Sequence, residues 1–224
     1  MNVLLIGASR GIGLEFAQQY IDAGDRVIAT ARDAAGLERL QDLGAQTMKL
    51  DVSNPASVSG LSWKLDGEKI DLAIYVAGVF FTEGALSPPT QHSFDRLLHT
   101  NVLGAMQAIP QVAPWVEEAG GQFAFITSDM CRIGGVSGSS GWLYQVSKAA
   151  LNMAVVAAQP DYPRARFVLF HPGWVQTDMG TAAAPLRVED SVTGMRRTLY
   201  SSKGATKPPQ VPFLNWDGTA FTTW

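Results

Sequence analysis

A tyrosine and a lysine stand four residues apart in the segment YQVSK (144–148), within a stretch that is typical of a helix, 142–158. Residues at this separation share one face of a helix, so the phenol and the ammonium are neighbours. A nearby positive charge favours the phenolate and lowers the pKa of a tyrosine from its usual value of about 10. With Lys148 in that role, Tyr144 could donate a proton to a developing alkoxide and take it back in the reverse direction. Taken alone, the pair could equally be a core tyrosine and a lysine that reaches past it to solvent.

Two further polar residues stand where they could serve the same chemistry. Ser128 ends the apolar segment GQFAFITS (121–128), at the strand edge where a substrate carbonyl would lie. Asn101 falls inside a helix candidate, 91–118, although asparagine is not favoured in helix interiors. We expect the Asn101 side chain to hold a water molecule that links Lys148 to solvent.

The segment GASRGIG (7–13) directly follows the first apolar run and precedes a helix candidate. Glycine permits a tight turn and lets the backbone approach a pyrophosphate, whose charge the helix N-terminus attracts. A strand-to-helix turn without a ligand would use glycine in the same way, and the spacing differs from the commoner G-x-G-x-x-G. The segment predicts a dinucleotide site formed by Gly7, Ser9, Arg10, Gly11, Ile12 and Gly13.

The end of the second apolar run, VIATARD (27–33), bears on which dinucleotide is bound. An acidic residue there would bind the ribose 2′-hydroxyl of NAD, whereas an arginine would bind the 2′-phosphate of NADP. Ala31 holds the position of the acid and Arg32 follows it, with Arg10 expected close to the same ribose. Because guanidinium groups bind phosphate through two parallel hydrogen bonds, the sequence favours NADP(H) over NAD(H). Asp33 is the counter-argument, but we expect it to begin the next helix.

Two more segments at the ends of expected strands extend the predicted cofactor site. The Asp51 carboxylate could accept a hydrogen bond from the adenine amino group with Val52 against the ring, although Asp51 alone is better explained as the start of a turn. In HPGWVQTD (171–178) a proline and a glycine give a rigid turn. The Val175 backbone and the Thr177 hydroxyl that follow could hold the carboxamide and a phosphate of the cofactor. The residues expected to do so are Pro172, Gly173, Val175 and Thr177.

Short apolar segments alternate with helix candidates, which predicts an α/β fold with a doubly wound, parallel, seven-stranded sheet in a single domain, 1–224. Runs such as LAIYVA suit parallel strands that are buried on both faces. In such folds ligands bind at the carboxyl ends of the strands, where the residues above stand. The expected strands are 2–8, 26–31, 45–51, 71–77, 121–128, 166–172 and 211–216. The expected helices are 11–23, 34–43, 54–66, 91–118, 142–158 and 188–200, with a bend or break at Pro110 and Pro114.

The composition is that of an ordinary globular protein. Of 224 residues 46% are hydrophobic and 17% charged, and the formal net charge is −3, which does not favour nucleic acid or an anionic membrane as partner. No apolar stretch is long enough to span a membrane, and no basic residue precedes the short apolar run at the N-terminus as in a signal peptide. The one cysteine, Cys131, cannot form an internal disulfide, which fits a reducing cytoplasm. His92, His99 and His171 lack metal-ligand spacing, so no metal is expected.

Together these motifs resemble those of the short-chain dehydrogenase/reductase family, and in detail its carbonyl-reductase and C-factor-like branch. They occur in the family's order: a glycine motif, an Asn–Ser–Tyr–Lys tetrad and a Pro-Gly-x-x-x-Thr segment. They match Gly7, Gly11 and Gly13, then Asn101, Ser128, Tyr144 and Lys148, then Pro172, Gly173 and Thr177. The resemblance implies a Rossmann fold whose tetrad is catalytic, with Tyr144 and Lys148 also touching the cofactor.

Two departures from the family's pattern concern the scaffold rather than the chemistry. Where the family often has Asn-Asn-Ala-Gly after the fourth strand, this chain has Tyr75-Val76-Ala77-Gly78. Ala77 and Gly78 still leave room for the adenine ribose and join the predicted cofactor site, whereas the missing second asparagine removes a hydrogen bond to the sheet. The threonine that usually precedes the first glycine is Ile6, which removes another such bond.

We expect an enzyme that transfers a hydride from NADPH to a ketone or aldehyde, reversibly. Apolar residues near the tetrad predict an open, roomy site for apolar small-molecule carbonyl substrates of a broad range, and a short lid is expected at about 178–208. The alternatives are a reductase of a non-carbonyl acceptor, such as a pterin or quinone, and a non-enzymatic nucleotide-sensing or signalling protein on this fold. An intact Tyr144 and Lys148 argue against the last. The apolar residues are Phe80, Phe81, Met130, Trp142, Trp174 and Met179.

The helix candidate 142–158 also bears on assembly. Its segment 149–159 has no charged residue, which is unusual for a solvated face. The family usually associates through helices that flank the sheet, so the resemblance implies a homodimer or homotetramer formed by 91–118 and 142–158. Ala150, Val155 and Ala158 are expected on the outer face. The alternative is that the helix is buried entirely within its own subunit.

Overall fold

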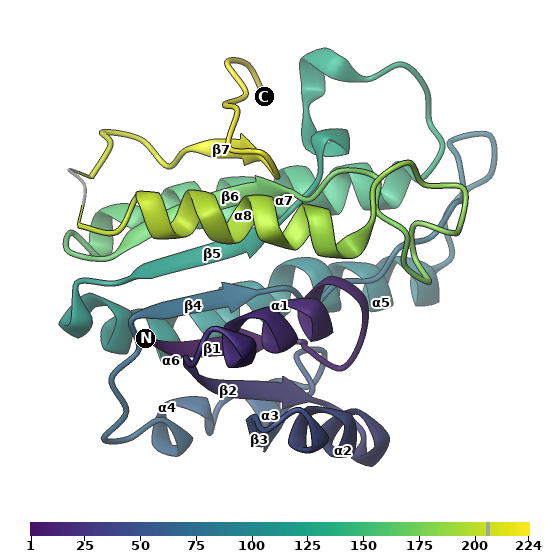
Figure 1. Cartoon of the computed structure of the whole chain (residues 1–224). Helices are drawn as coiled ribbons and strands as arrows, with labels where there is room; N and C mark the ends of the chain where they lie inside the picture. Colours follow the sequence, from purple (N-terminus) through teal and green to yellow (C-terminus); the bar gives the residue numbers. More distant parts are fainter. Residues whose placement is uncertain (205–206) are drawn as a thin grey trace.

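The computed structural model describes residues 1–204 and 207–224. Within them, strands form one parallel sheet with the order β3-β2-β1-β4-β5-β6-β7, which confirms the predicted doubly wound, seven-stranded arrangement (Figure 1). All six strand pairs are parallel. The strands are β1 (Asn2–Ile6), β2 (Arg26–Ala31), β3 (Gln46–Lys49), β4 (Leu72–Tyr75), β5 (Gln122–Ile126), β6 (Arg166–His171) and β7 (Phe213–Asn215).

Helices cover both faces of the sheet. In Figure 1, α1 and α8 lie in front of the strands, and α6 and α7 lie behind them. Each layer buries an apolar face, with Phe16 and Met195 on one side and Val112 and Leu151 on the other. The helices are α1 (Gly11–Asp22), α2 (Ala34–Asp42), α3 (Pro55–Val58), α4 (Leu61–Lys64), α5 (Gln91–Leu98), α6 (Gly104–Ala119), α7 (Trp142–Ala158) and α8 (Val188–Ser201).

The strand order reverses between β1 and β4, because the chain runs outward through β2 and β3 and then returns to the other side of β1. The carboxyl ends of β1 and β4 therefore border the crevice where doubly wound folds bind ligands. Gly7 and Ala77 meet there so closely that a Cβ on Gly7 would lie 2.7 Å from the Ala77 Cα, and Gly7 also has a positive φ of +88°. Glycine is required at this point both for its conformation and for space.

The helix candidate 91–118 is interrupted, but not at its prolines. A π-helical turn, His99–Leu103, separates α5 from α6, whereas Pro110 and Pro114 both lie inside α6. Of the bend or break expected at the prolines, the break was therefore wrong. Both prolines lie on the exposed side of α6. On that side water can bind a backbone carbonyl whose helical hydrogen bond is lengthened or missing, so the helix can continue past a proline.

The candidate 54–66 forms two short helices, α3 and α4, rather than one. Its start is as expected, since the Asn54 carboxamide accepts a hydrogen bond from the Ala56 amide at 3.0 Å and Pro55 occupies the first turn.

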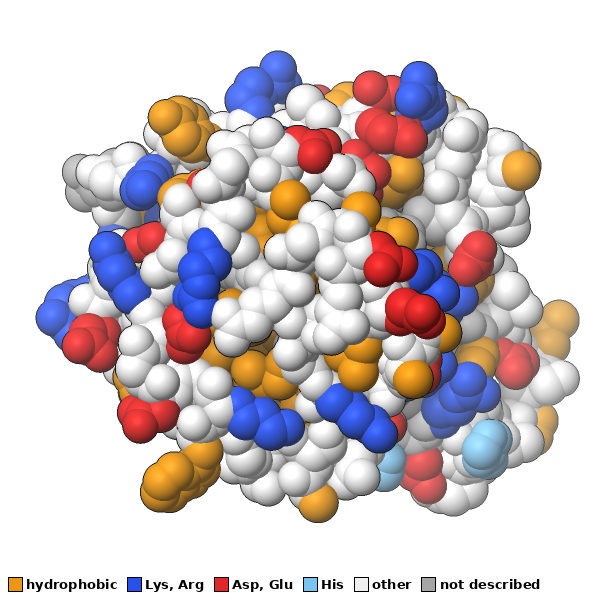
Figure 2. Space-filling view, turned by 60° about the horizontal axis from the view of Figure 1, so that its bottom comes forward, with side chains coloured by type: hydrophobic (Ala, Val, Ile, Leu, Met, Phe, Trp, Pro, Cys, Tyr) orange, Lys and Arg blue, Asp and Glu red, His pale blue; other side chains and the backbone are white. Residues whose placement is uncertain are grey.

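The face in Figure 2 shows basic and acidic side chains interspersed, with apolar side chains in small patches between them. Among the described residues, no helix combines the length and the apolar character needed to cross a membrane.

Candidate active site

Three of the four predicted catalytic residues converge at the carboxyl edge of β5. Tyr144 and Lys148 come from the inner face of α7 and are 8% and 3% exposed. The Lys148 Nζ donates a hydrogen bond to the Ile126 carbonyl at 2.9 Å and lies 5.6 Å from the centre of the Tyr144 ring. Ser128 follows β5 and is also buried, and its hydroxyl accepts a hydrogen bond from the Met130 amide at 3.2 Å. The structure thus places a hydroxyl, a phenol and an ammonium in one buried group.

The pKa of Tyr144 is raised rather than lowered, contrary to the expected net direction. Burial raises the pKa of Tyr144 well above its usual value, and the nearby Ser128 hydroxyl only partly opposes that rise. Burial also lowers the pKa of Lys148 to about 8. Desolvation disfavours the charged form of each group and is the largest cause of both shifts. At neutral pH the phenol is therefore protonated, and the amine still carries most of its charge.

Asn101 lies in the π-helical turn and is fully buried. Its carboxamide oxygen accepts a hydrogen bond from the Val79 amide at 2.8 Å, and its nitrogen donates to the Val79 carbonyl at 2.9 Å and to the Ser147 hydroxyl at 3.0 Å. The carboxamide thus binds Val79 and Ser147, and the expected water link between Asn101 and Lys148 stays a prediction. A Cβ on Gly78 would lie 3.4 Å from the Asn101 oxygen and 3.6 Å from the Lys148 Nζ, so the absence of a side chain at Gly78 leaves an open position that both atoms border.

The glycine segment lies at the start of α1, beside Ala77. A Cβ on Gly13 would lie 2.5 Å from the Gly7 carbonyl oxygen, so this glycine lets the helix pack closely on the strand end. The first turn of α1 has neither a side-chain cap nor an acidic residue, which leaves its amides available to an anion. The hydrogen bond expected to be lost at Ile6 is supplied from β2, since the Gly7 amide donates to the Thr30 hydroxyl at 3.0 Å.

The two predicted phosphate-binding arginines are exposed near this turn. Arg10 forms an ion pair with Asp178 at 2.8 Å, with both side chains mostly exposed. Exposed pairs of this kind contribute little, so a phosphate could replace the carboxylate. Asp33 caps α2 by accepting from the Gly36 amide at 2.8 Å, as expected, and lies 3.9 Å from the Arg32 guanidinium. Sequence reasoning missed Arg39, which donates to the Ser9 carbonyl at 3.1 Å.

The remaining predicted cofactor residues border the same edge. One Asp51 oxygen is occupied by the Ser53 amide and hydroxyl at 3.0 and 2.7 Å, which is the turn given as the alternative explanation of this residue. Val52 beside it is buried. Thr177 approaches the glycine segment, since a Cβ on Gly11 would lie 3.2 Å from its methyl group.

Residues 172–175 form the turn between β6 and Thr177. Gly173 has a φ of +85°, and Val175 is buried and bridges to Leu186. The predicted lid, 178–208, includes α8, whose Val192 is buried against the sheet as part of a helical layer. The segment 178–187 lies beside the glycine turn through Asp178, and residues 205 and 206 lie outside the described residues.

Apolar residues pack around Tyr144. Phe80 meets the Tyr144 ring edge to face, with centroids 4.9 Å apart, and Phe81 and Met130 belong to the same cluster. The other three aromatic or methionine residues named for the pocket are largely exposed, namely Trp142, Trp174 and Met179. Half of the predicted pocket residues thus belong to the cluster that contains Tyr144, and Phe80 contacts its ring.

A histidine and an aspartate next to Ser128 also join the site. The Ser128 hydroxyl donates to the Asp129 carboxylate at 3.3 Å, and the Asp129 amide donates to the His171 Nδ1 at 3.1 Å. Burial lowers the pKa of His171, which keeps that nitrogen available as an acceptor. Cys131 is also buried there, and burial raises the pKa of its thiol to about 11, so its thiol is a poor nucleophile.

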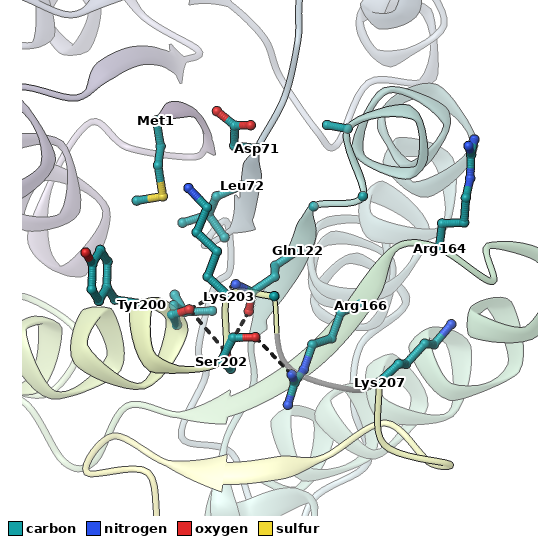
Figure 3. Close-up of a pocket in the computed structure, with 15 residues that line it drawn as sticks. Met1, Asp71, Leu72, Gln122, Arg164, Arg166, Tyr200, Ser202, Lys203 and Lys207 are labelled. Atoms are coloured by element: carbon teal, nitrogen blue, oxygen red, sulfur yellow. Dashed lines mark hydrogen bonds between the residues drawn. The ribbon is translucent and has the colours of Figure 1, made fainter.

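A separate hollow lies at the opposite, amino-terminal edge of the sheet (Figure 3). Three of the residues that line it are joined by hydrogen bonds: Arg166 donates to the Ser202 carbonyl at 3.1 Å, and the Ser202 hydroxyl donates to the Gln122 oxygen at 2.9 Å. Gln122 donates in turn to the Leu199 carbonyl at 2.9 Å. These bonds tie the end of α8 to β5 and β6, so the hollow is explained by packing.

Comparisons with known proteins agree with this geometry. The model of the family described as short chain dehydrogenase matches residues 1–186. The C-signal protein of Myxococcus xanthus is 34% identical over 153 residues, which cover 67% of this chain and 90% of that protein. The chain therefore belongs to the short-chain dehydrogenase/reductase family of oxidoreductases.

Two solved structures share the whole fold. A putative short-chain dehydrogenase/reductase from Burkholderia multivorans with bound NADP is 27% identical, with a TM-score of 0.90 over 100% of this chain and 99% of that one. An NADPH-bound carbonyl reductase from chicken fatty liver is 28% identical, with a TM-score of 0.86 over 100% and 98%. The fold is thus one on which related proteins bind this dinucleotide.

Proposed function

We propose that this chain is an NADPH-dependent reductase of ketones or aldehydes that also oxidises the corresponding alcohols. The observation that carries the proposal is the buried group formed by Ser128, Tyr144 and Lys148 at the carboxyl edge of β5. Burial of an ammonium costs free energy, and a protein that only binds a nucleotide would not need an ammonium buried beside a tyrosine. The comparison structures with NADP and NADPH support the choice of cofactor.

The described residues fit such a cofactor. The uncapped first turn of α1 would hold the pyrophosphate, and the exposed guanidinium groups of Arg10 and Arg32 would hold the 2′-phosphate. Gly78 leaves an open position beside Lys148, whose ammonium would bind ribose hydroxyls. When bound, NADPH supplies the hydride.

The side chains supply the proton and the orientation. The Ser128 hydroxyl donates a hydrogen bond to the carbonyl oxygen, and the Tyr144 phenol donates its proton to the same oxygen. Because burial raises the pKa of Tyr144, the acid needed for reduction is the resting form at neutral pH. In the oxidative direction the Lys148 ammonium stabilises the phenolate that must form. With Phe80 and Met130 around the phenol, we expect apolar ketones and aldehydes to be preferred.

A second candidate is a signalling role, because the C-signal protein is 34% identical over most of its length. A nucleotide-dependent signal protein would need the cofactor site but no turnover. A reductase of a pterin or quinone would use the same buried group. Measurement of turnover distinguishes a signalling protein from a reductase. The range of acceptors that are reduced distinguishes a carbonyl reductase from a reductase of a pterin or quinone.

The test is a substrate panel. The purified chain is mixed with NADPH and with aliphatic ketones, aromatic ketones, aldehydes, a pterin and a quinone, and the loss of reduced nicotinamide absorbance is followed. We expect turnover with apolar carbonyl compounds, slower turnover with NADH, and none without acceptor. Tight NADPH binding with no turnover on any acceptor would favour the signalling role.

A further inference from the structure

We infer that Tyr75 is a positioning residue, which holds the π-helical turn of Asn101 in place by binding the Thr100 carbonyl. The inference rests on the proposed function and adds Asn101 to it: the Asn101 carboxamide donates to the Ser147 hydroxyl, which donates to the Tyr144 carbonyl at 2.8 Å, so Asn101 supports the helical turn that carries Tyr144. Tyr75 ends β4, is fully buried, and its hydroxyl donates a hydrogen bond to the Thr100 carbonyl at 3.0 Å. Its hydroxyl binds Thr100 rather than Ser128, Tyr144 or Lys148, so it would act through Asn101.

The π turn explains why this carbonyl needs a partner. The Gly104 amide donates to the His99 carbonyl, five residues back, whereas an α-helix would pair it with the Thr100 carbonyl. The Thr100 carbonyl is displaced from that pairing and is bound by Tyr75 instead. A buried carbonyl without a partner is costly, so the tyrosine stabilises the π turn relative to a regular helix.

The surroundings are shaped for this bond. A Cβ on Gly104 would lie 2.7 Å from the Tyr75 hydroxyl oxygen and 2.7 Å from the Val52 carbonyl oxygen. Any side chain at this position would therefore displace the hydroxyl. The ring of Tyr75 is stacked on Phe125 with centroids 6.3 Å apart, and burial raises the pKa of Tyr75 far above its usual value, so it remains a donor.

The turn in question sets the direction of Asn101. Removal of the extra residue of the π turn would rotate the helix on one side relative to the other by about 100°, the angle per residue of an α-helix. Asn101 would then lose its contacts with Val79 and Ser147. We therefore expect the hydroxyl of Tyr75 to matter for turnover, although it is remote from the reacting atoms.

The experiment deletes that hydroxyl with Tyr75→Phe. We expect kcat to fall by about 10- to 100-fold, the range for a small misplacement of a site residue, with little change in the KM for NADPH. If Tyr75 acts through Asn101, the same substitution has no further effect in an Asn101→Ala background. The matched control is Tyr20→Phe, which removes the hydroxyl of an equally buried tyrosine in the other helical layer and should leave kcat unchanged. An unchanged kcat in Tyr75→Phe, or an equal fall in the Asn101→Ala background, overturns the inference.

A second measurement needs no activity. The side-chain amide of Asn101 and the backbone amide of Gly104 are observed by NMR in the wild type, in Tyr75→Phe and in Gly104→Ala, which places a methyl group against the hydroxyl. Both variants should shift the Asn101 signal and alter hydrogen exchange at residue 104 or its neighbours, and unchanged signals in both overturn the inference. If the wild type shows no turnover, the proposed function fails while this measurement still decides the role of Tyr75.

Discussion

The buried ammonium of Lys148 should cost the folded chain stability, and the cost should depend on pH. Lys148 is 3% exposed, and burial lowers its pKa from 10.5 to about 8. Below the folded pKa both the folded and the unfolded chain carry the proton, and the full penalty is present. As the pH rises from about 8 towards 10.5, the folded chain releases the proton first, so the contribution of this group becomes less unfavourable.

The magnitude follows from the pKa. A lysine with a pKa near 8 in place of 10.5 corresponds to a penalty of roughly 3 kcal/mol at neutral pH. Lys148→Met fills the same space without the charge, but leaves the Ile126 carbonyl without its donor, which costs about 1–3 kcal/mol. The free energy of unfolding of the variant should therefore equal or exceed that of the wild type at neutral pH, although its reductase activity is lost.

The assay is denaturant unfolding of both proteins at about pH 7 and about pH 9.5. We expect the stability of Lys148→Met relative to the wild type to decrease by about 2 kcal/mol between these values, because the wild type gains as its lysine loses the proton. Lys64→Met is the control, since the Lys64 ammonium lies at the surface, and its difference from the wild type should stay constant. A constant difference for Lys148→Met would refute the reasoning.

The remaining predictions concern cofactor choice, pH and assembly. Arg32→Asp should weaken NADP(H) binding by about 10- to 100-fold and retain NAD(H), and a wild type that already prefers NAD(H) contradicts the assignment. Reduction should decline as the pH rises through about 8, where Lys148 loses its charge, and a flat profile to pH 10 or so contradicts that. We propose a homodimer or tetramer through the outer face of α7, where Met153 is 68% exposed and Ala157 is also exposed. Ala157→Glu should then reduce the mass measured by light scattering, and a monomeric wild type refutes it.

Much of the site could be predicted because its signals are local. The spacing of Tyr144 and Lys148 sets them on one helical face whatever the rest of the chain does. The glycines mark points where backbone segments meet too closely for a side chain, and Gly7 against Ala77 is such a contact. Asp33 was expected as a helix start from its position after a strand, and it caps α2.

Features that depend on distant parts of the chain could not be predicted. The pKa of Tyr144 rises because packing removes its water, and sequence spacing carries no measure of burial depth. The helix interruption at His99–Leu103 coincides with the bond from Tyr75, which is remote in sequence, whereas the visible prolines indicated the wrong place. Val155 was expected on the outer face of α7 but is fully buried, because a helix that is apolar all round gives no sign of which side faces inward.

The most direct test of the proposed chemistry is Tyr144→Phe, which keeps the ring and its contact with Phe80 but deletes the proton donor. We expect kcat for carbonyl reduction to fall by at least ~10²-fold, while the dissociation constant for NADPH stays nearly the same. Both are measured on the same preparation, with nicotinamide absorbance for turnover and fluorescence for binding. Turnover at the wild-type rate in this variant would contradict the assignment of Tyr144 as the general acid.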